Sequence, residues 1–174
     1  MKLRCDLHIN GGSRKLVLVP EASETGEHLG LKLAAYLIFW DRSPLVEASP
    51  RHPALLGQEF VPDLLSLDEA GAVDLWVECG KVTLRKMYKL TRRFPGARLV
   101  VMKGTEAEAV RLRRDLKEGL DKEARVEILA WPGETFRGWM AALHEKTEAY
   151  GEAGGRSLNL VINEHPLAVE LKVF

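Results

Sequence analysis

The stretch Val61–Lys81, VPDLLSLDEAGAVDLWVECGK, decides how the rest of the chain is read. It contains a Pro-Asp pair, Pro62-Asp63, then a polar turn, and then an apolar segment that carries one acid, Glu78. A carboxylate in a buried strand is costly unless it is paired or binds a metal. We therefore predict a hairpin that brings Asp63 and Glu78 together, because two such carboxylates are a minimal ligand set for a divalent cation. A nearby lysine would complete a metal-dependent phosphodiester hydrolase site.

This layout resembles the nucleases of the restriction-endonuclease-like fold, whose signature is Pro-Asp, a spacer and then acid-x-Lys. The chain departs from that signature at one position: the residue two after Glu78 is Gly80, and the lysine follows one place later, at Lys81. In some branches of that superfamily the lysine lies on the following helix. The resemblance implies an α/β fold in which helices flank a mixed β-sheet.

A second resemblance covers nearly the whole chain. Three motifs carry it, namely a helix start with the helix that follows it, an acidic strand, and a basic helix: Ser23–Glu27 with Leu31–Leu37, Asp74–Gly80, and Arg85-Lys86. With them the chain resembles the YaeQ family of small bacterial proteins, which have the same nuclease-like fold. It departs from that family at Glu21-Ala22, where the family has His-Pro, and in a shorter segment before Arg85. The family's activity is undefined, so this resemblance implies a fold rather than a reaction.

Composition limits the class of protein. The 174 residues suit one domain, residues 1–174, with a sizeable core. The formal net charge is zero, which argues against nucleic-acid binding over the whole surface but allows a local basic patch. Cys5 and Cys79 are too few for a disulfide framework or a zinc site. With no apolar leader and no membrane-spanning run, we expect a cytoplasmic protein.

The periodicity of apolar residues predicts strands at both ends of the chain and alternating strands and helices between them. Asn10-Gly11 is a strong signal for an N-terminal hairpin, and Asn163–Pro166 separates two strands of a C-terminal hairpin. The predicted helices begin at Ser23 and then cover Val82–Phe94, Thr105–Leu120 and most of Glu134–Tyr150; the predicted strands between them are Phe60–Leu65, Val73–Cys79, Arg98–Met102 and Val126–Ala130.

The candidate metal site consists of Asp63 and Glu78, which would hold Mg²⁺ or Mn²⁺. Many nucleases of this fold add a glutamate from the first helix, and Glu27 has the matching YaeQ-like position. The alternative is structural: Asp63 closes a turn, Glu78 pairs with a helix lysine, and Glu27 stabilises the helix dipole. Asp74, on the same strand face as Glu78, is either a further ligand or a cap at the strand entry.

Three lysines are candidates for stabilising the negative charge that develops during catalysis: Lys81, Lys86 and Lys89. Lys86 matches the helix lysine of the YaeQ family, and Lys81 is nearest in sequence to Glu78. The same helix carries a basic stripe that would bind nucleic acid, unless it is simply a solvated face; the stripe consists of Arg85, Lys89, Arg92 and Arg93. We expect no metal role for the histidines: His8, His28, His52, His144 and His165.

The leading functional hypothesis is therefore a divalent-metal-dependent nuclease that hydrolyses DNA or RNA. The alternative is a non-catalytic nucleic-acid-binding or regulatory module that keeps the fold and has lost the acid-x-Lys geometry. Gly80 in place of the lysine favours the alternative, whereas the retained acids favour the nuclease.

Overall fold

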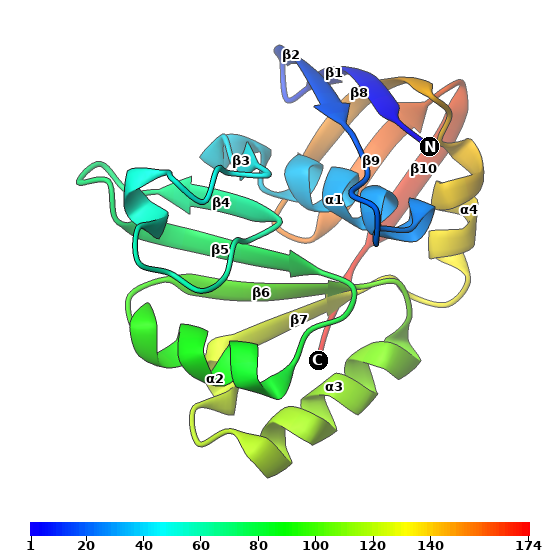
Figure 1. The fold of residues 1–174 in the computed structure, drawn as a ribbon. Coiled ribbons are helices and arrows are strands. Elements are labelled where there is room, and N and C mark those ends of the chain that lie inside the picture. Colours follow the sequence, from blue (N-terminus) through cyan, green and yellow to red (C-terminus); the bar gives the residue numbers. More distant parts are fainter.

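The computed structural model describes residues 1–174 and contains two mixed β-sheets and four α-helices (Figure 1). One sheet has six strands in the order β11-β7-β6-β5-β4-β3, and the other has five in the order β10-β9-β8-β1-β2. The helices are α1 Gly26–Ile38, α2 Leu84–Arg93, α3 Glu106–Gly119 and α4 Thr135–Ala142. The strands are β1 Leu3–Ile9, β2 Gly12–Leu18, β3 Leu45–Val46, β4 Leu64–Leu67, β5 Val73–Cys79, β6 Arg98–Lys103, β7 Val126–Ala130, β8 Lys146–Gly154, β9 Ser157–Ile162, β10 His165–Glu170 and β11 Lys172–Val173.

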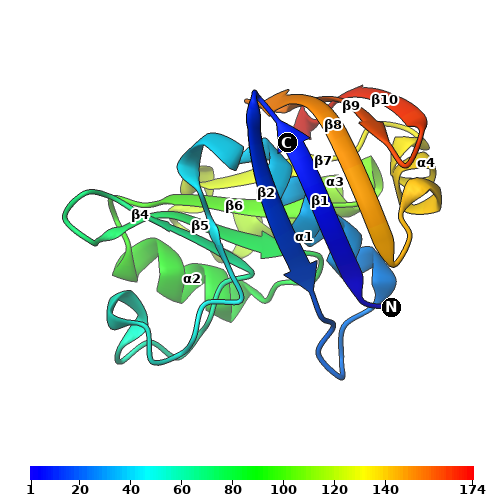
Figure 2. The same ribbon diagram turned by 90° about the horizontal axis from the view of Figure 1, so that it is seen from above.

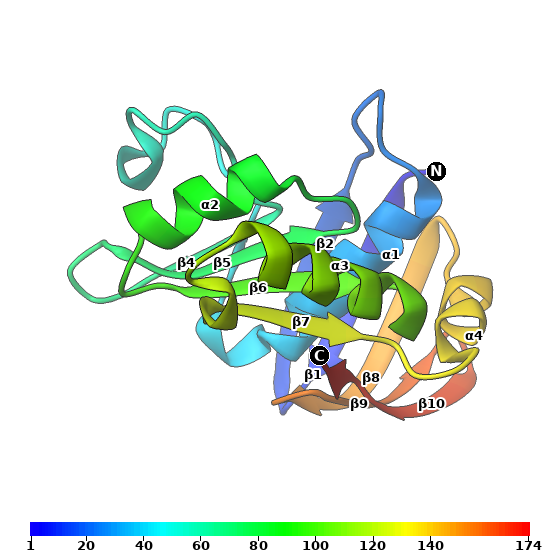
Figure 3. The same ribbon diagram turned by 90° about the horizontal axis from the view of Figure 1, so that it is seen from below.

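The six-stranded sheet carries the predicted site. Its central strands β5, β6 and β7 are parallel, while β4 and β3 extend the sheet on the β5 side in antiparallel fashion. Helices α2 and α3 lie side by side on one face of this sheet, as the view from below shows (Figure 3). Helix α1 covers the other face and separates it from the five-stranded sheet (Figure 1). One face of β5 therefore packs against α1, and the other face packs against the layer formed by α2 and α3.

The two predicted terminal hairpins form parts of the same five-stranded sheet. Asn10 and Gly11, both at positive φ (53° and 79°), make the tight turn between β1 and β2. Strand β8 then joins the N-terminal hairpin to the C-terminal one, because it pairs in parallel with β1 and antiparallel with β9 (Figure 2). The prediction of helix over most of Glu134–Tyr150 is correct only for α4, since the chain turns after Leu143 and continues as β8.

The core consists of two apolar clusters on either side of the six-stranded sheet. The larger one fills the space between the two sheets around α1, and includes Leu33, Leu37, Val77 and Trp131. The smaller one lies under α2 and α3, and includes Trp76. Val77 and Trp76 alternate along β5, so one strand contributes to both clusters. An ionised side chain is costly in a strand that is buried on both faces. Glu78, near the end of β5, must therefore have a partner.

Polar caps set the helix starts. Thr25, rather than the predicted Ser23, caps α1, because its side-chain oxygen accepts a hydrogen bond from the backbone N–H of His28. Thr105 and Glu108 form a reciprocal capping box at the start of α3, as predicted for Thr105. None of these helices has both the length and the apolar character needed to cross a bilayer.

Candidate functional site

Asp63 lies just before β4, at the edge where β4 joins β5. Its Oδ2 accepts a hydrogen bond from the backbone N–H of Cys79 at 2.7 Å, which fixes the carboxylate against the end of β5. Its Oδ1 lies 2.9 Å from Nε2 of His28 and 3.4 Å from Nζ of Lys32, both on α1. Burial opposes the charge of this carboxylate, but the hydrogen bond and the charge of His28 outweigh burial and lower the pKa of Asp63.

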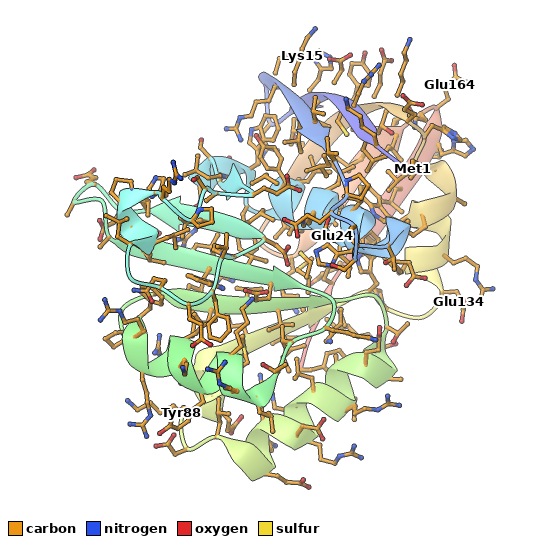
Figure 4. All side chains as sticks on the ribbon, in the orientation of Figure 1. Met1, Lys15, Glu24, Tyr88, Glu134 and Glu164 are labelled. Carbon is orange, nitrogen blue, oxygen red and sulfur yellow. The ribbon has the colours of Figure 1, made fainter.

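Lys32 is the centre of this group, although its immediate neighbours in the sequence of α1 are apolar. Only 2% of the residue is exposed, and its Nζ lies 2.6 Å from Oε1 of Glu24 and 3.1 Å from Oε1 of Glu47. Burial disfavours the ammonium, yet the hydrogen bond with Glu24 and the charge of Asp63 raise the pKa of Lys32 above its usual value. Three carboxylates therefore share one buried cation, and Figure 4 shows Glu24 beside α1.

The sequence holds a signal for this cluster. Glu24, His28 and Lys32 are spaced by four residues, so that they follow one side of the helix start and α1. Lys32 also interrupts a run of apolar residues, where a charged side chain needs a partner. His28, for which no metal role is expected, is partly buried and contacts both Asp63 and Glu24, so it is a satisfied residue of this cluster.

Glu78 has a separate set of partners. It is 5% exposed, and its Oε1 accepts a hydrogen bond from Nε1 of Trp76 at 2.7 Å and lies 2.6 Å from Nζ of Lys86. Burial raises the pKa of Glu78, and the opposing effect of Lys86 does not cancel that increase. The helix lysine that the YaeQ resemblance implies, Lys86, is thus the one that reaches this acid.

The structure does not bring Asp63 and Glu78 to one shared cation. The side-chain partners of Asp63 come from α1, and the cation that pairs with Glu78 comes from α2, on the opposite face of the sheet (Figures 1 and 3). Leu64 pairs with Val77, so the two acids are near each other in register, but their carboxylates turn to different layers. The two acids therefore belong to two separate ion-pair groups, and a metal site that they share stays a prediction.

Glu27 and Lys81 do not join either group. Glu27 is exposed, and the acid that α1's N-terminal region contributes is Glu24, three residues earlier. Lys81 is exposed and forms no ion pair. Gly80 has φ +79°, a backbone conformation that a lysine adopts only at a cost, and this explains why the residue two after Glu78 is a glycine. Asp74 pairs with Arg42 at the other end of β5, away from Glu78.

The predicted basic stripe is present on α2. Five of the ten residues in this helix are cations and none is acidic. Glu59 pairs with both Arg85 and Lys89, and Asp121 lies 3.5 Å from Arg92. Tyr88 is 43% exposed, points outward from α2 in Figure 4, and packs against the guanidinium of Arg92 at 4.5 Å. The four predicted binding residues are exposed: Arg85, Lys89, Arg92 and Arg93.

The most compact set of potential metal ligands is Glu24, His28 and Asp63, whose nearest ligand atoms all lie within 4.8 Å of one another. One imidazole nitrogen with two carboxylates suits a transition ion better than Mg²⁺, which prefers oxygen ligands. However, Nζ of Lys32 already lies within ion-pair distance of both carboxylates. In this arrangement these residues do not fit a divalent ion, because the buried ammonium of Lys32 already supplies the positive charge between the two carboxylates.

Comparison with known proteins was made for sequence and for structure. No protein-family model matches the chain, and no curated protein matches it either. Among solved structures it is similar to the YaeQ protein from Xanthomonas axonopodis pv. citri, with a TM-score of 0.73 and 19% identity, covering 99% of this chain and 96% of that one. It is also similar to the YaeQ protein from Pseudomonas syringae, with a TM-score of 0.69 and 16% identity, covering 99% and 93%. The chain therefore has the fold of the YaeQ proteins.

Proposed function

We propose that this chain binds the phosphodiester backbone of nucleic acid through α2, as a non-hydrolytic module on the YaeQ fold. The observation that carries the proposal is the composition of α2, which presents exposed cations around an exposed tyrosine. Cations supply the attraction to phosphates, and an exposed aromatic ring offers a surface on which a base can stack. The ring of Tyr88 is already held by Arg92, so the platform is preorganised.

The state of the acids supports a binding role over a hydrolytic one. Glu24, Glu47 and Asp63 share Lys32, and Glu78 has Lys86. Metal-assisted hydrolysis needs carboxylates that are free to hold the ion. Here each of these carboxylates already has a lysine within ion-pair distance, while the cations of α2 outnumber the two exposed acids that face them, Glu59 and Asp121.

Fluorescence anisotropy with labelled single-stranded and double-stranded DNA and RNA tests the proposal. We expect saturable binding that weakens with salt, and the double variant Arg92→Ala/Arg93→Ala should weaken it and flatten its salt dependence. The matched control is Arg137→Ala, which removes an exposed arginine from α4 on a different side of the molecule. Wild-type protein that binds none of these probes at low salt, or a double variant that binds as the control does, would refute the proposal.

A second candidate is divalent-metal-dependent phosphodiester hydrolysis, which the contact between Lys86 and Glu78 favours. This pair places an acid and a lysine together, as the nuclease signature requires, with the lysine supplied by α2. Mn²⁺ and Mg²⁺ titrations followed by calorimetry, with a nucleic-acid cleavage assay, decide between the candidates. Cleavage that Glu78→Gln and Lys86→Met both abolish would establish hydrolysis. Prolonged incubation with metal that leaves a broad panel of DNA and RNA intact would exclude it.

A further inference from the structure

A groove between α2 and α3 contains two cations, Lys103 and Arg111, that neither the predicted site nor the basic stripe uses. It has a volume of about 540 Å³ and lies beside the carboxyl ends of β5 and β6. Its floor and sides include Phe60, Val82 and Leu112, which give it an apolar wall. The charged side chains that line it are Lys81, Lys86, Lys103, Arg111, Glu108 and Asp115.

Lys103 is the unusual member of this set. It is the last residue of β6 and only 8% exposed, so its ammonium has lost most of its contact with water. Its Nζ donates one hydrogen bond, to the carbonyl oxygen of Gly80 at 2.5 Å, and no carboxylate lies within ion-pair distance. An ammonium has three donors, so two remain for a partner that the protein does not supply. A buried cation without a counter-ion is costly, and the cost is relieved when an anion binds.

The other charges of the groove leave the anion position free. Lys81 and Arg111 are exposed on its rim and form no ion pair, whereas Lys86 is neutralised by Glu78. Of the two acids, Glu108 accepts the capping-box hydrogen bonds of Thr105 and is the acid whose charge acts on Lys103, although it is not within ion-pair distance, and Asp115 lies 3.6 Å from Arg114. Three cations without ion-pair partners therefore surround one concave space.

We propose that this groove binds a phosphate monoester, with Lys103 at its base and Lys81 and Arg111 at its rim. A monoester is favoured over a diester because it carries up to two charges, which better match three convergent cations. Lysine and arginine side chains supply charge-assisted hydrogen bonds to its oxygens. The apolar wall suits an organic group attached to the phosphate. Both a free phosphate compound and the phosphorylated end of a nucleic acid present this chemistry.

Calorimetric titration of the full chain with inorganic phosphate tests the site directly. We expect saturable binding that Lys103→Met weakens about tenfold or more, because the substitution keeps the length of the side chain and removes the charged donor. Arg111→Ala and Lys81→Ala remove exposed side chains and should each weaken binding less. The matched control is Lys117→Ala, since Lys117 is exposed on α3, forms no ion pair and does not line this groove. Thermal unfolding of each variant verifies that it is folded.

A second arm separates the two sources of the phosphate and keeps this inference distinct from binding through α2. Oligonucleotides with a 5′-phosphate and with a 5′-hydroxyl are compared on wild type, Lys103→Met and Arg92→Ala/Arg93→Ala. Preference for the 5′-phosphate that only Lys103→Met removes would identify a nucleic-acid end as the ligand. No such preference, together with phosphate binding that depends on Lys103, would identify a free phosphate compound. Absence of saturable phosphate binding by wild type, or equal affinity of wild type, Lys103→Met and Lys117→Ala, would overturn the inference.

Discussion

Nζ of Lys86 lies 2.6 Å from Oε1 of Glu78, yet this contact does not fully compensate the burial of the acid. The side chain of Glu78 is 6% exposed, whereas that of Lys86 is 17% exposed and reaches the acid from α2. The charge of Glu78 therefore relies on the ion pair more than the charge of Lys86 does. The acid is enclosed, whereas the lysine has a route along its aliphatic stem toward water.

This asymmetry predicts different effects for the two halves of the pair. Glu78→Gln should change the free energy of unfolding at pH 7 by no more than about 1 kcal/mol, because it removes a charge that burial disfavours. Lys86→Met should destabilise the protein by about 2 kcal/mol or more, because the buried carboxylate then has no cation. Because the pKa of Glu78 is raised in the folded state, wild type should gain stability relative to Glu78→Gln as the pH falls below neutral.

Urea unfolding at several pH values measures the free energy of unfolding of both variants and of wild type. The control for lost packing is Lys89→Met, since Lys89 lies on the same helix with a half-exposed side chain and pairs only with exposed Glu59. A loss of several kcal/mol in Glu78→Gln would mean that the ion pair itself holds α2 on the sheet.

Lys32 should be among the most sensitive polar residues of the chain. Lys32→Met leaves Glu24, Glu47 and Asp63 without their common cation, and only His28 remains to balance them. Removing one partner of a buried ionic group costs about 3–5 kcal/mol. Chemical denaturation checks this value, with Lys15→Met as the control, because Lys15 is 90% exposed and its pair with Asp6 lies at the surface. A loss below about 1 kcal/mol would show that the carboxylates reach water.

The pair formed by His28 and Asp63 should make stability depend on pH in two separate ranges. The pKa of His28 is raised, although burial alone would lower it, because of its hydrogen bond with Asp63. A raised pKa in the folded state stabilises the protein fully below about pH 6.5, the unfolded value, and this contribution is lost as the pH rises through the folded value. The pKa of Asp63 is lowered, so its contribution is present above about pH 3.9 and disappears in more acidic solution.

Titration of the His28 ring by NMR measures the first range. Its midpoint should lie above about 6.5 in wild type and fall in Asp63→Asn, which keeps the shape of the side chain and removes its charge. A midpoint that does not respond to this substitution would mean that Glu24 alone, at 3.2 Å, sets the pKa of His28.

Gly151 is the position in β8 where a side chain is least tolerable. Its φ is +142°, and a Cβ there would meet the backbone carbonyl oxygen of Asn159 on the neighbouring strand. Gly151→Ala should cost about 1–3 kcal/mol, since both the backbone conformation and the strand spacing oppose it. Gly96→Ala is the control, because nothing lies within 4 Å of a Cβ at that position. Equal unfolding midpoints of the two variants would contradict this account.

Local sequence signals predicted much of this structure. The turn at Asn10-Gly11, the capping box at Thr105 and the buried strand Val126–Ala130 are each specified by residues close in sequence. Strand β8 was missed because its residues follow α4 without a Gly or Pro break, and because its partner β1 lies at the other end of the chain. Hydrophobic periodicity carries no information about such long-range pairing.

The candidate site was predicted less well, for a related reason. The sequence predicts Asp63, Glu78 and Lys86 as site residues, but the layer that each carboxylate faces depends on helices from distant segments. Asp63 precedes β4, so the alternation of the strand does not fix its orientation. Lys32 is absent from the predicted site because the residues around it in α1 are apolar and indicate only a buried helix. A lone charge among such residues is the signal that identifies it.

The parallel pairing of β1 with β8 has a consequence for how the chain acquires its structure. Arg4 lies opposite Lys146, so one edge of β1 stays unpaired until a strand more than a hundred residues later in the sequence is available. Contacts across such separations slow folding, and an unpaired strand edge invites pairing with another molecule. The charged residues on the solvent face of this hairpin, Arg4 and Asp6 of β1 and Lys15 of β2, disfavour such pairing during synthesis. We expect strands β3 to β7 of the six-stranded sheet to pair before the five-stranded sheet forms, because β8, β9 and β10, which complete the sheet that contains β1, come later in the chain.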